Sequence, residues 1–171
     1  MTTDRRPPHQ QRDTPGPGQE SVWDYPRPPR VEPTDELVVV ELAGVRVLET
    51  HRALRVLETS HPPAYYLPAE DFLAGVLAPA EGSSFCEFKG TATYLDVVSP
   101  GRTAARAAWT YRRPDPGYEV LGGHISLYPG QMDLVTVDSE RVRAQDGGFY
   151  GGWITDRVVG PFKGAPGTRG W

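Results

Sequence analysis

The sequence predicts a mainly β protein: an antiparallel barrel or open sandwich with one or two short helices and an extended N-terminal arm. Three observations favour this fold. Seven or eight short runs of branched and aromatic residues follow one another at close intervals. Glycine and proline, 19 and 18 of the 171 residues, separate these runs and leave little room for long helices. A hydrophobic fraction of 38% is enough for one core of ordinary size, so we expect a single domain.

The N-terminal region predicts a tail followed by an arm. Residues 1–20 are rich in proline, glutamine, arginine and glycine, and they bury too little apolar surface to offset the entropy of ordering. We therefore expect a disordered tail there and the folded domain over residues 21–171. Prolines impose an extended path on residues 21–30, where Trp23 and Tyr25 can anchor the arm to the body. The alternative for the arm is a solvated linker.

Residues 37–48 predict a hairpin. Branched apolar residues fill both halves, and Ala43-Gly44 between them supplies a short turn whose glycine can adopt a positive φ. The next segment, residues 51–58, fits either a helical turn capped by Thr50 or a short strand, and its periodicity leaves both open.

A strand and a short helix are expected next. Pro62 and Pro63 favour an extended approach to residues 64–67, which Pro68 ends. Residues 69–77 then fit a short helix. Its inward face would carry four apolar side chains: Phe72, Leu73, Val76 and Leu77.

The longest predicted strand covers residues 84–98 and has two different faces. Alternation places Cys86 and every second residue after it on a face of mostly small, apolar side chains that suits the core. The other face carries Glu87 and Lys89, an acid and a base two residues apart beside the ring of Phe85. This second face therefore predicts the half-exposed wall of a pocket.

Further strands and tight turns fill the C-terminal half. Residues 104–111 predict the hairpin partner of the central strand. Three short strands are expected after it, at residues 118–121, 124–128 and 132–137. Between residues 147 and 155, bulky aromatic residues lie among paired glycines, a pattern typical of backbone that passes close to other elements.

Composition and charge exclude several function classes. A net charge of −4 and a pI near 5.6 do not suit a surface for phosphate backbones, so we expect no nucleic-acid partner. No apolar run approaches a membrane span, and the N-terminus lacks the apolar middle of a signal peptide, so we expect a cytoplasmic protein without membrane contact. One cysteine and four histidines without ligand spacing predict no structural metal and no cofactor.

Charged and aromatic residues predict a pocket for a small molecule. Its candidate lining residues are Glu87, Lys89, Tyr65, Tyr66, Trp109 and Tyr111. Clusters of aromatic residues with few charges are typical of pockets for planar or cationic ligands, although core packing explains some of these rings equally well. Consecutive tyrosines in a strand point to opposite faces, so only one of Tyr65 and Tyr66 is expected in the pocket, and the sequence does not tell which.

Glu87 is the candidate for a catalytic role. A desolvated carboxylate beside Lys89 could act as a general base, with its pKa set by the lysine. The alternative is a surface ion pair that contributes little. A thiolate–imidazole pair of Cys86 with His61 or His124 is a weaker hypothesis, because alternation sends Cys86 to the core.

The leading functional hypothesis is a β domain that binds an unknown small molecule. The alternative is an interaction module, in which the proline-rich arm or residues 149–171 contact a partner or a second copy of the chain in a homodimer. That alternative predicts an exposed apolar patch at Trp23, Trp153 or Trp171. A third reading is an enzyme that uses Glu87 as its acid or base.

Several of these segments together resemble a bacterial family called domain of unknown function 427. The resemblance rests on residues 21–29, on residues 54–68, and on Cys86-Glu87-Phe88-Lys89-Gly90 with Tyr94. Residues 147–155 and 160–171 are similar to one subgroup of that family. The resemblance implies a compact, mostly antiparallel β fold, described as a tent, with a pocket between its sheets.

The same family also carries a nucleotidyltransferase-like label, and relatives of the tent fold carry zinc bound by cysteine pairs. Metal-dependent nucleotidyl transfer needs closely spaced carboxylates to hold Mg²⁺ against a triphosphate. The sequence contains no Asp-x-Asp pair and no Gly-Ser followed by one, and Cys86 has no second cysteine to pair with.

Overall fold

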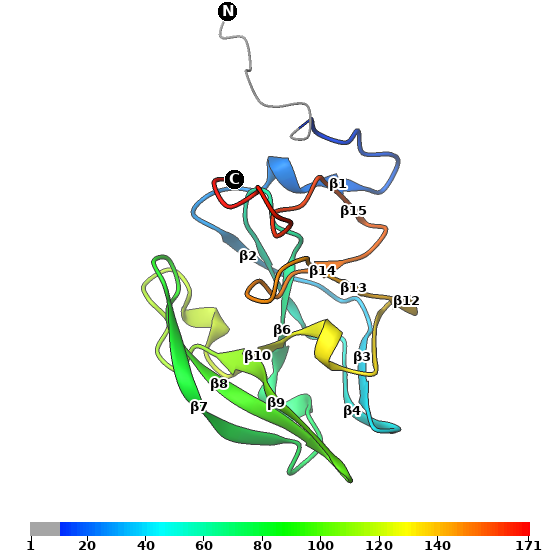
Figure 1. Ribbon diagram of the computed structural model, residues 1–171, viewed down its shortest axis with the longest axis vertical. Helices are drawn as coiled ribbons and strands as arrows, with labels where there is room; N and C mark the ends of the chain where they lie inside the picture. Colours follow the sequence, from blue (N-terminus) through cyan, green and yellow to red (C-terminus); the bar gives the residue numbers. More distant parts are fainter. Residues whose placement is uncertain (1–10) are drawn as a thin grey trace, which may run out of the picture.

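The computed structural model describes residues 11–171, whose strands form two main antiparallel sheets (Figure 1). The larger sheet has seven strands in the spatial order β2 (Arg30–Pro33), β5 (Leu54–Leu57), β6 (Ala64–Pro68), β10 (His124–Leu127), β9 (Arg102–Thr110), β8 (Gly90–Ser99) and β7 (Leu77–Cys86). The smaller sheet has four, in the order β12 (Glu140–Arg141), β11 (Leu134–Val137), β3 (Val38–Leu42) and β4 (Val45–Thr50). The mainly β prediction is confirmed, and of its two alternatives the open arrangement is correct, because neither sheet closes into a barrel.

Two short strand pairs and four 3-10 turns complete the described residues. β1 (Glu20–Ser21) runs parallel to β15 (Val158–Val159), and β13 (Arg143–Ala144) pairs with β14 (Trp153–Ile154). The 3-10 turns are η2 (Val22–Asp24), η3 (Ala69–Asp71), η4 (Glu119–Leu121) and η5 (Pro129–Gln131). No helix in residues 11–171 is long and apolar enough to cross a membrane.

The predicted β3–β4 hairpin is confirmed. Ala43 and Gly44 both have positive φ, at 51° and 76°, the backbone that a two-residue turn between twisted strands requires. The open question at residues 51–58 is resolved in favour of a strand, β5, which lies between β2 and β6. The 64–67 strand is also confirmed, as β6.

The helix predicted for residues 69–77 is wrong. Only the η3 turn forms, because Gly75 has a φ of 80° and Leu77 already pairs with Val97 as the first residue of β7. Phe72 and Val76 are buried as expected, whereas Leu73 is 53% exposed. The strand predicted for residues 118–121 is likewise replaced, by the single turn η4.

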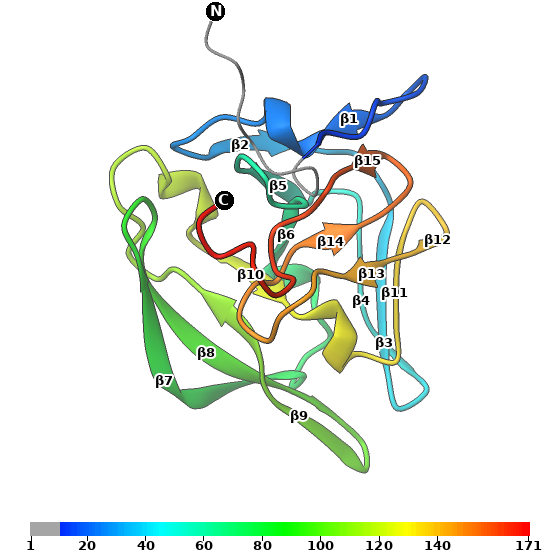
Figure 2. The ribbon, with the colours of Figure 1, turned by 45° about the horizontal axis from the view of Figure 1, so that its top comes forward.

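The single strand predicted for residues 84–98 is wrong as well. The chain reverses at Glu87-Phe88-Lys89, so β7 and β8 form a hairpin in which Cys86 pairs with Gly90. Gly90 closes the turn with a φ of 106°, and a side chain there would meet Asp115 at 3.1 Å. In Figures 1 and 2 this long hairpin lies at one edge of the molecule, away from β3 and β4.

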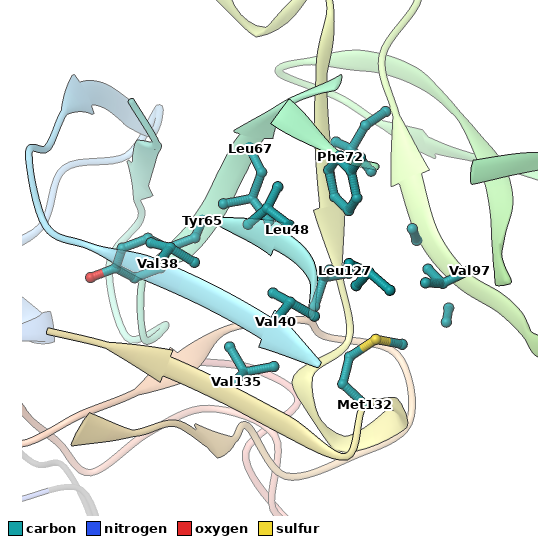
Figure 3. Close-up of a cluster of buried hydrophobic side chains, with 14 of the residues drawn as sticks. Val38, Val40, Leu48, Tyr65, Leu67, Phe72, Val97, Leu127, Met132 and Val135 are labelled. Carbon is teal, nitrogen blue, oxygen red and sulfur yellow. The ribbon is translucent and has the colours of Figure 1, made fainter. Parts of the chain in front are cut away.

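Side-chain alternation in β6 divides the interior into two clusters. Tyr65 and Leu67 join the core between the two sheets, which Figure 3 shows around Val38, Val40 and Leu48. Tyr66 points to the other face of the larger sheet. There it packs in a second cluster with Leu54, Val56, Ala92, Trp109, Tyr111, Tyr118 and Leu121.

The N-terminal arm packs against the C-terminal segment. A disordered tail is predicted for residues 1–20, and residues 1–10 of it lie outside the described residues. Glu20, at the end of the predicted tail, pairs with Val158 in β15. Val22 and Tyr25 are buried with Val158 in a third apolar cluster. The Trp23 ring lies 5.4 Å from the ring of Trp171, and its indole N–H donates to the Pro161 carbonyl at 2.9 Å.

Candidate functional site

A cavity of about 280 Å³ lies over the second cluster, on the face of the larger sheet that is turned away from the smaller sheet. The β7–β8 turn forms one wall, and the loop between β13 and β14 forms the opposite wall. Strands β5, β6, β8 and β9 supply its floor. The main lining side chains are Glu58, His61, Tyr66, Phe85, Cys86, Lys89, Tyr94, Trp109, Tyr111, Tyr128, Gln145, Phe149, Tyr150 and Lys163.

Five of the six candidate residues line this cavity: Glu87, Lys89, Tyr66, Trp109 and Tyr111. The sixth, Tyr65, lies on the opposite face of the sheet. Its ring stacks on Trp153 with a centroid distance of 4.8 Å, and its hydroxyl donates to Glu36 at 2.9 Å. Tyr66 is therefore the tyrosine on the cavity side, as alternation along β6 requires.

Glu87 and Lys89 reach the cavity in a different way from the one that alternation predicted. Both belong to the turn between β7 and β8, where Glu87 is exposed and Lys89 is half-buried. Within the described chain neither residue forms an ion pair, with the other or with any third side chain. The predicted acid–base pair is thus replaced by a lone ammonium at the cavity wall and a solvated carboxylate at its rim.

The Lys89 ammonium lies against aromatic rings. Its Nζ is 5.8 Å from the centre of the Tyr111 ring, within the range of a cation–π contact. Burial alone would lower the pKa of Lys89, but the side chains of Tyr66 and Cys86 and the Glu58 carboxylate raise it above its ordinary value. Lys89 is therefore a cation at neutral pH rather than a neutral amine nucleophile.

The aromatic side chains of the floor hold one another in place. The Trp109 indole N–H donates to the Tyr66 hydroxyl at 3.2 Å, and the two rings meet edge to face. Trp109 also lies 4.7 Å from Tyr128, measured between ring centroids. Burial, more than any other cause, raises the pKa of Tyr66 and of Tyr111, so both phenols are neutral hydrogen-bonding groups at neutral pH.

The β13–β14 loop fits onto this floor only because it is rich in glycine. A Cβ on Gly151 would lie 2.1 Å from the Trp109 ring, and one on Gly152 would lie 2.5 Å from both Pro62 and Gln145. These distances agree with the close backbone passage that the glycine–aromatic pattern predicted. The partner it passes, Trp109, could not be read from the sequence.

His61 is held at the cavity edge with both ring nitrogens engaged. The Gln145 carbonyl oxygen accepts from the Gly152 N–H at 3.0 Å, so the Gln145 amide nitrogen is the donor that faces His61 Nδ1 at 3.2 Å. The imidazole proton then resides on Nε2, 3.3 Å from Glu58. Burial would raise the pKa of Glu58, but the contact with His61 and nearby positive charges lower it.

This arrangement bears on the hypothesis of a thiolate–imidazole pair. Cys86 is half-buried and lines the cavity together with His61, so it does not lie in the core as predicted. Both His61 nitrogens already have partners, which leaves none to accept a thiol proton. His124 lies elsewhere, in a separate pocket beside Arg52 and Glu70.

Two phenylalanines flank the mouth of the cavity. Phe85 near the end of β7 is 73% exposed, and Phe149 in the β13–β14 loop is 63% exposed. Trp153, which the interaction-module alternative placed in an exposed patch, is instead fully buried in the core. No group of three or more histidine, cysteine, aspartate or glutamate side chains in residues 11–171 is arranged to hold a metal ion.

These features define a small antiparallel β protein whose larger sheet carries an aromatic cavity with two lysines, Lys89 and Lys163. Residues 30–138 match the family model described as a domain of unknown function (DUF427), and the chain belongs to this family. The matched region includes Lys89 and the aromatic floor, while the β13–β14 loop that completes the cavity lies beyond it. No curated protein matches the chain.

Proposed function

We propose that the cavity binds a small planar molecule that carries an anionic group. The observation that carries this proposal is the environment of Lys89, an ammonium that is half-buried among aromatic rings and has no carboxylate within 4 Å in residues 11–171. The raised pKa keeps this group charged, so it is available to pair with an anion that enters the cavity. A bound carboxylate, phosphate or similar anion would form the ion pair that no side chain of residues 11–171 supplies.

The aromatic walls support a planar ligand. Tyr66, Trp109, Tyr111 and Tyr128 present rings and neutral hydroxyls to the space beside Lys89. A volume of about 280 Å³ is near the lower limit of small-molecule pockets, which begin at roughly 300 Å³. One or two fused rings with a single polar substituent would fill it.

The charge of the ligand follows from the same lysine. Aromatic clusters also suit cationic ligands, but Lys89 repels a second cation at this wall. Glu58 offers no alternative site for a cation, because its carboxylate already faces His61 at 3.3 Å and Arg27 at 3.4 Å. We assign Glu87 no catalytic role, because it lies exposed at the rim, where water solvates its carboxylate.

A fluorescence titration tests the proposal, because Trp109 lines the cavity. The probes are naphthalene-2-carboxylate, the neutral naphthalene-2-carboxamide and the cationic naphthalen-2-ylmethylammonium, which share a ring and differ in charge. We expect saturable quenching by the carboxylate, weaker binding of the amide and none of the ammonium compound. Binding of the cation at least as tight as that of the carboxylate, or no saturable binding of any probe, would overturn the proposal.

A further inference from the structure

A second, more open cavity of about 530 Å³ adjoins the first. The two share five lining residues: Tyr94, Tyr128, Gln145, Phe149 and Tyr150. The hydroxyl of Tyr128 donates to the Phe149 carbonyl at 3.0 Å, which ties the end of β10 to the β13–β14 loop along this shared wall. The first cavity contains Lys89 and Lys163, and the second contains a different cation, Arg106.

A bulge in β9 orients Arg106. The pairing register of β8 and β9 shifts between Leu95 and Val97, and Arg106 takes a φ of 53° there, which is uncommon for a residue with a side chain. The Arg106 N–H donates to the Asp96 carboxylate at 2.8 Å, which holds the bulged backbone. Bulges of this kind redirect a side chain out of the regular alternation of a strand.

The redirected guanidinium lies over an aromatic ring and has no counter-ion. Its Cζ sits 4.6 Å from the centre of the Tyr94 ring, in a cation–π contact. A side chain at Gly82 would come within 2.8 Å of its Nη2, so the bare backbone of β7 leaves the space that the guanidinium occupies. No carboxylate in the described residues lies within ion-pair distance of it, although most other arginines of residues 11–171 have such a partner.

We infer that the ligand carries a second anionic group, which Arg106 binds in the second cavity while the planar ring occupies the first. This inference rests on the proposed function and extends it from one anionic group to two. A guanidinium has paired N–H donors, which match the oxygens of a carboxylate or a phosphate, and the Tyr94 ring holds that of Arg106 in the second cavity. Tyr94, which lines both cavities, would lie alongside the part of the ligand that joins its two ends.

The experiment compares diacids with their monoacids. Naphthalene-2-carboxylate and biphenyl-4-carboxylate are titrated beside naphthalene-2,6-dicarboxylate and biphenyl-4,4′-dicarboxylate, and 6-phosphonooxynaphthalene-2-carboxylate separates a phosphate from a carboxylate at the second end. We expect at least one two-headed probe to bind about tenfold more tightly than its monoacid, as a charge-assisted pair implies. In Arg106→Gln this advantage is lost while monoacid affinity stays within about twofold.

The matched control is Arg102→Gln on the same strand, because Arg102 pairs with Asp133 outside both cavities. This variant keeps the preference for diacids. If monoacids bind in a Lys89-dependent way but no diacid binds more tightly, or if Arg106→Gln weakens both classes equally, the inference is wrong and the proposed function stands. If no acid binds, or Lys89→Met does not weaken binding, the proposed function itself fails.

Discussion

The Lys89 ammonium lies 5.8 Å from the centre of the Tyr111 ring, although the two residues belong to different strand connections. Lys89 is in the turn between β7 and β8, and Tyr111 follows directly after β9. Strand β8 lies between β7 and β9 in the sheet, and neighbouring strands are antiparallel. The turn before β8 and the residue after β9 are therefore at the same end of the sheet. A hairpin turn thereby places a cation among aromatic rings without an ion-pair partner in residues 11–171.

Lys89→Met should change the free energy of unfolding by less than about 1 kcal/mol. Methionine keeps most of the apolar contact of the lysine chain, and the lost attraction of the ammonium to the Tyr111 ring and to Glu58 is offset by the removal of its desolvation cost. Urea denaturation of the two proteins measures the difference. Glu87→Ala, an exposed change in the same turn, is the control and should be neutral. A decrease of more than about 1 kcal/mol in the free energy of unfolding of Lys89→Met would show that Lys89 stabilises the fold, and would contradict its assignment to ligand binding.

Gly151→Ala should destabilise the protein by about 1–3 kcal/mol. The added methyl would lie 2.1 Å from the Trp109 ring, so either the β13–β14 loop or the indole must move. Gly148→Ala in the same loop is the matched control, because its Cβ would meet nothing within 4 Å. Thermal unfolding of both variants checks this pair. Equal stability of the two would contradict the close packing of the loop on the cavity floor.

Arg55→Met should cost about 3–5 kcal/mol, the usual loss when one partner of a buried ion pair is removed. Arg55 is fully buried and donates to Glu20 at 2.9 Å and to Glu32 at 2.8 Å, so it joins the N-terminal arm and β2 to β5. Arg52→Met removes an exposed arginine that pairs with Glu70 and Asp71, and it should leave the denaturation midpoint almost unchanged. Similar denaturation midpoints for Arg55→Met and Arg52→Met would contradict the claim that the buried arginine stabilises the fold more than the exposed one.

The Glu20 carboxylate should make stability fall in acid. Burial would raise its pKa, but hydrogen bonds from Arg55 and Tyr25 and the charges of Arg55 and Arg157 lower it from 4.5 to about 2. A lowered folded-state pKa means that the stabilisation is fully present above pH 4.5 and is lost as the pH falls toward 2. Between pH 5 and pH 3 we expect a loss of about 1–2 kcal/mol from this group, after allowance for its partial exposure.

Glu20→Gln provides the comparison for that pH dependence. Its free energy of unfolding, measured by urea denaturation, should be lower than that of the wild type at pH 5 and should change less between pH 5 and pH 3. Parallel pH profiles for the two proteins would contradict the assignment of this acid sensitivity to Glu20.

The sequence predicted those parts of the fold that depend on local patterns. The Ala43-Gly44 turn and the opposite orientations of Tyr65 and Tyr66 follow from turn chemistry and alternation, and both are found. The reversal at Glu87-Phe88-Lys89 was missed because none of these three residue types favours turns, and Gly90 was the sole local signal.

The rest of the candidate site depends on contacts between segments that are distant in the chain. Tyr94, Tyr128 and Gln145 reach the cavity from β8, from the end of β10 and from the β13–β14 loop, and no spacing rule connects them. The burial of Arg55 was also missed, because its partner Glu20 lies 35 residues away in the chain. Alternation predicts the face on which a side chain lies, but pairing between distant strands decides which other side chains it meets.

Calorimetric titration of naphthalene-2-carboxylate into the wild type and into Lys89→Met at pH 7.5 tests whether Lys89 binds an anionic ligand. We expect one saturable site in the wild type, with a dissociation constant of about 0.1–1 mM for a ligand of this size. Binding to Lys89→Met should be at least tenfold weaker while the variant remains folded. Equal affinity of the two proteins, or no saturable heat with the wild type, would contradict this role of Lys89.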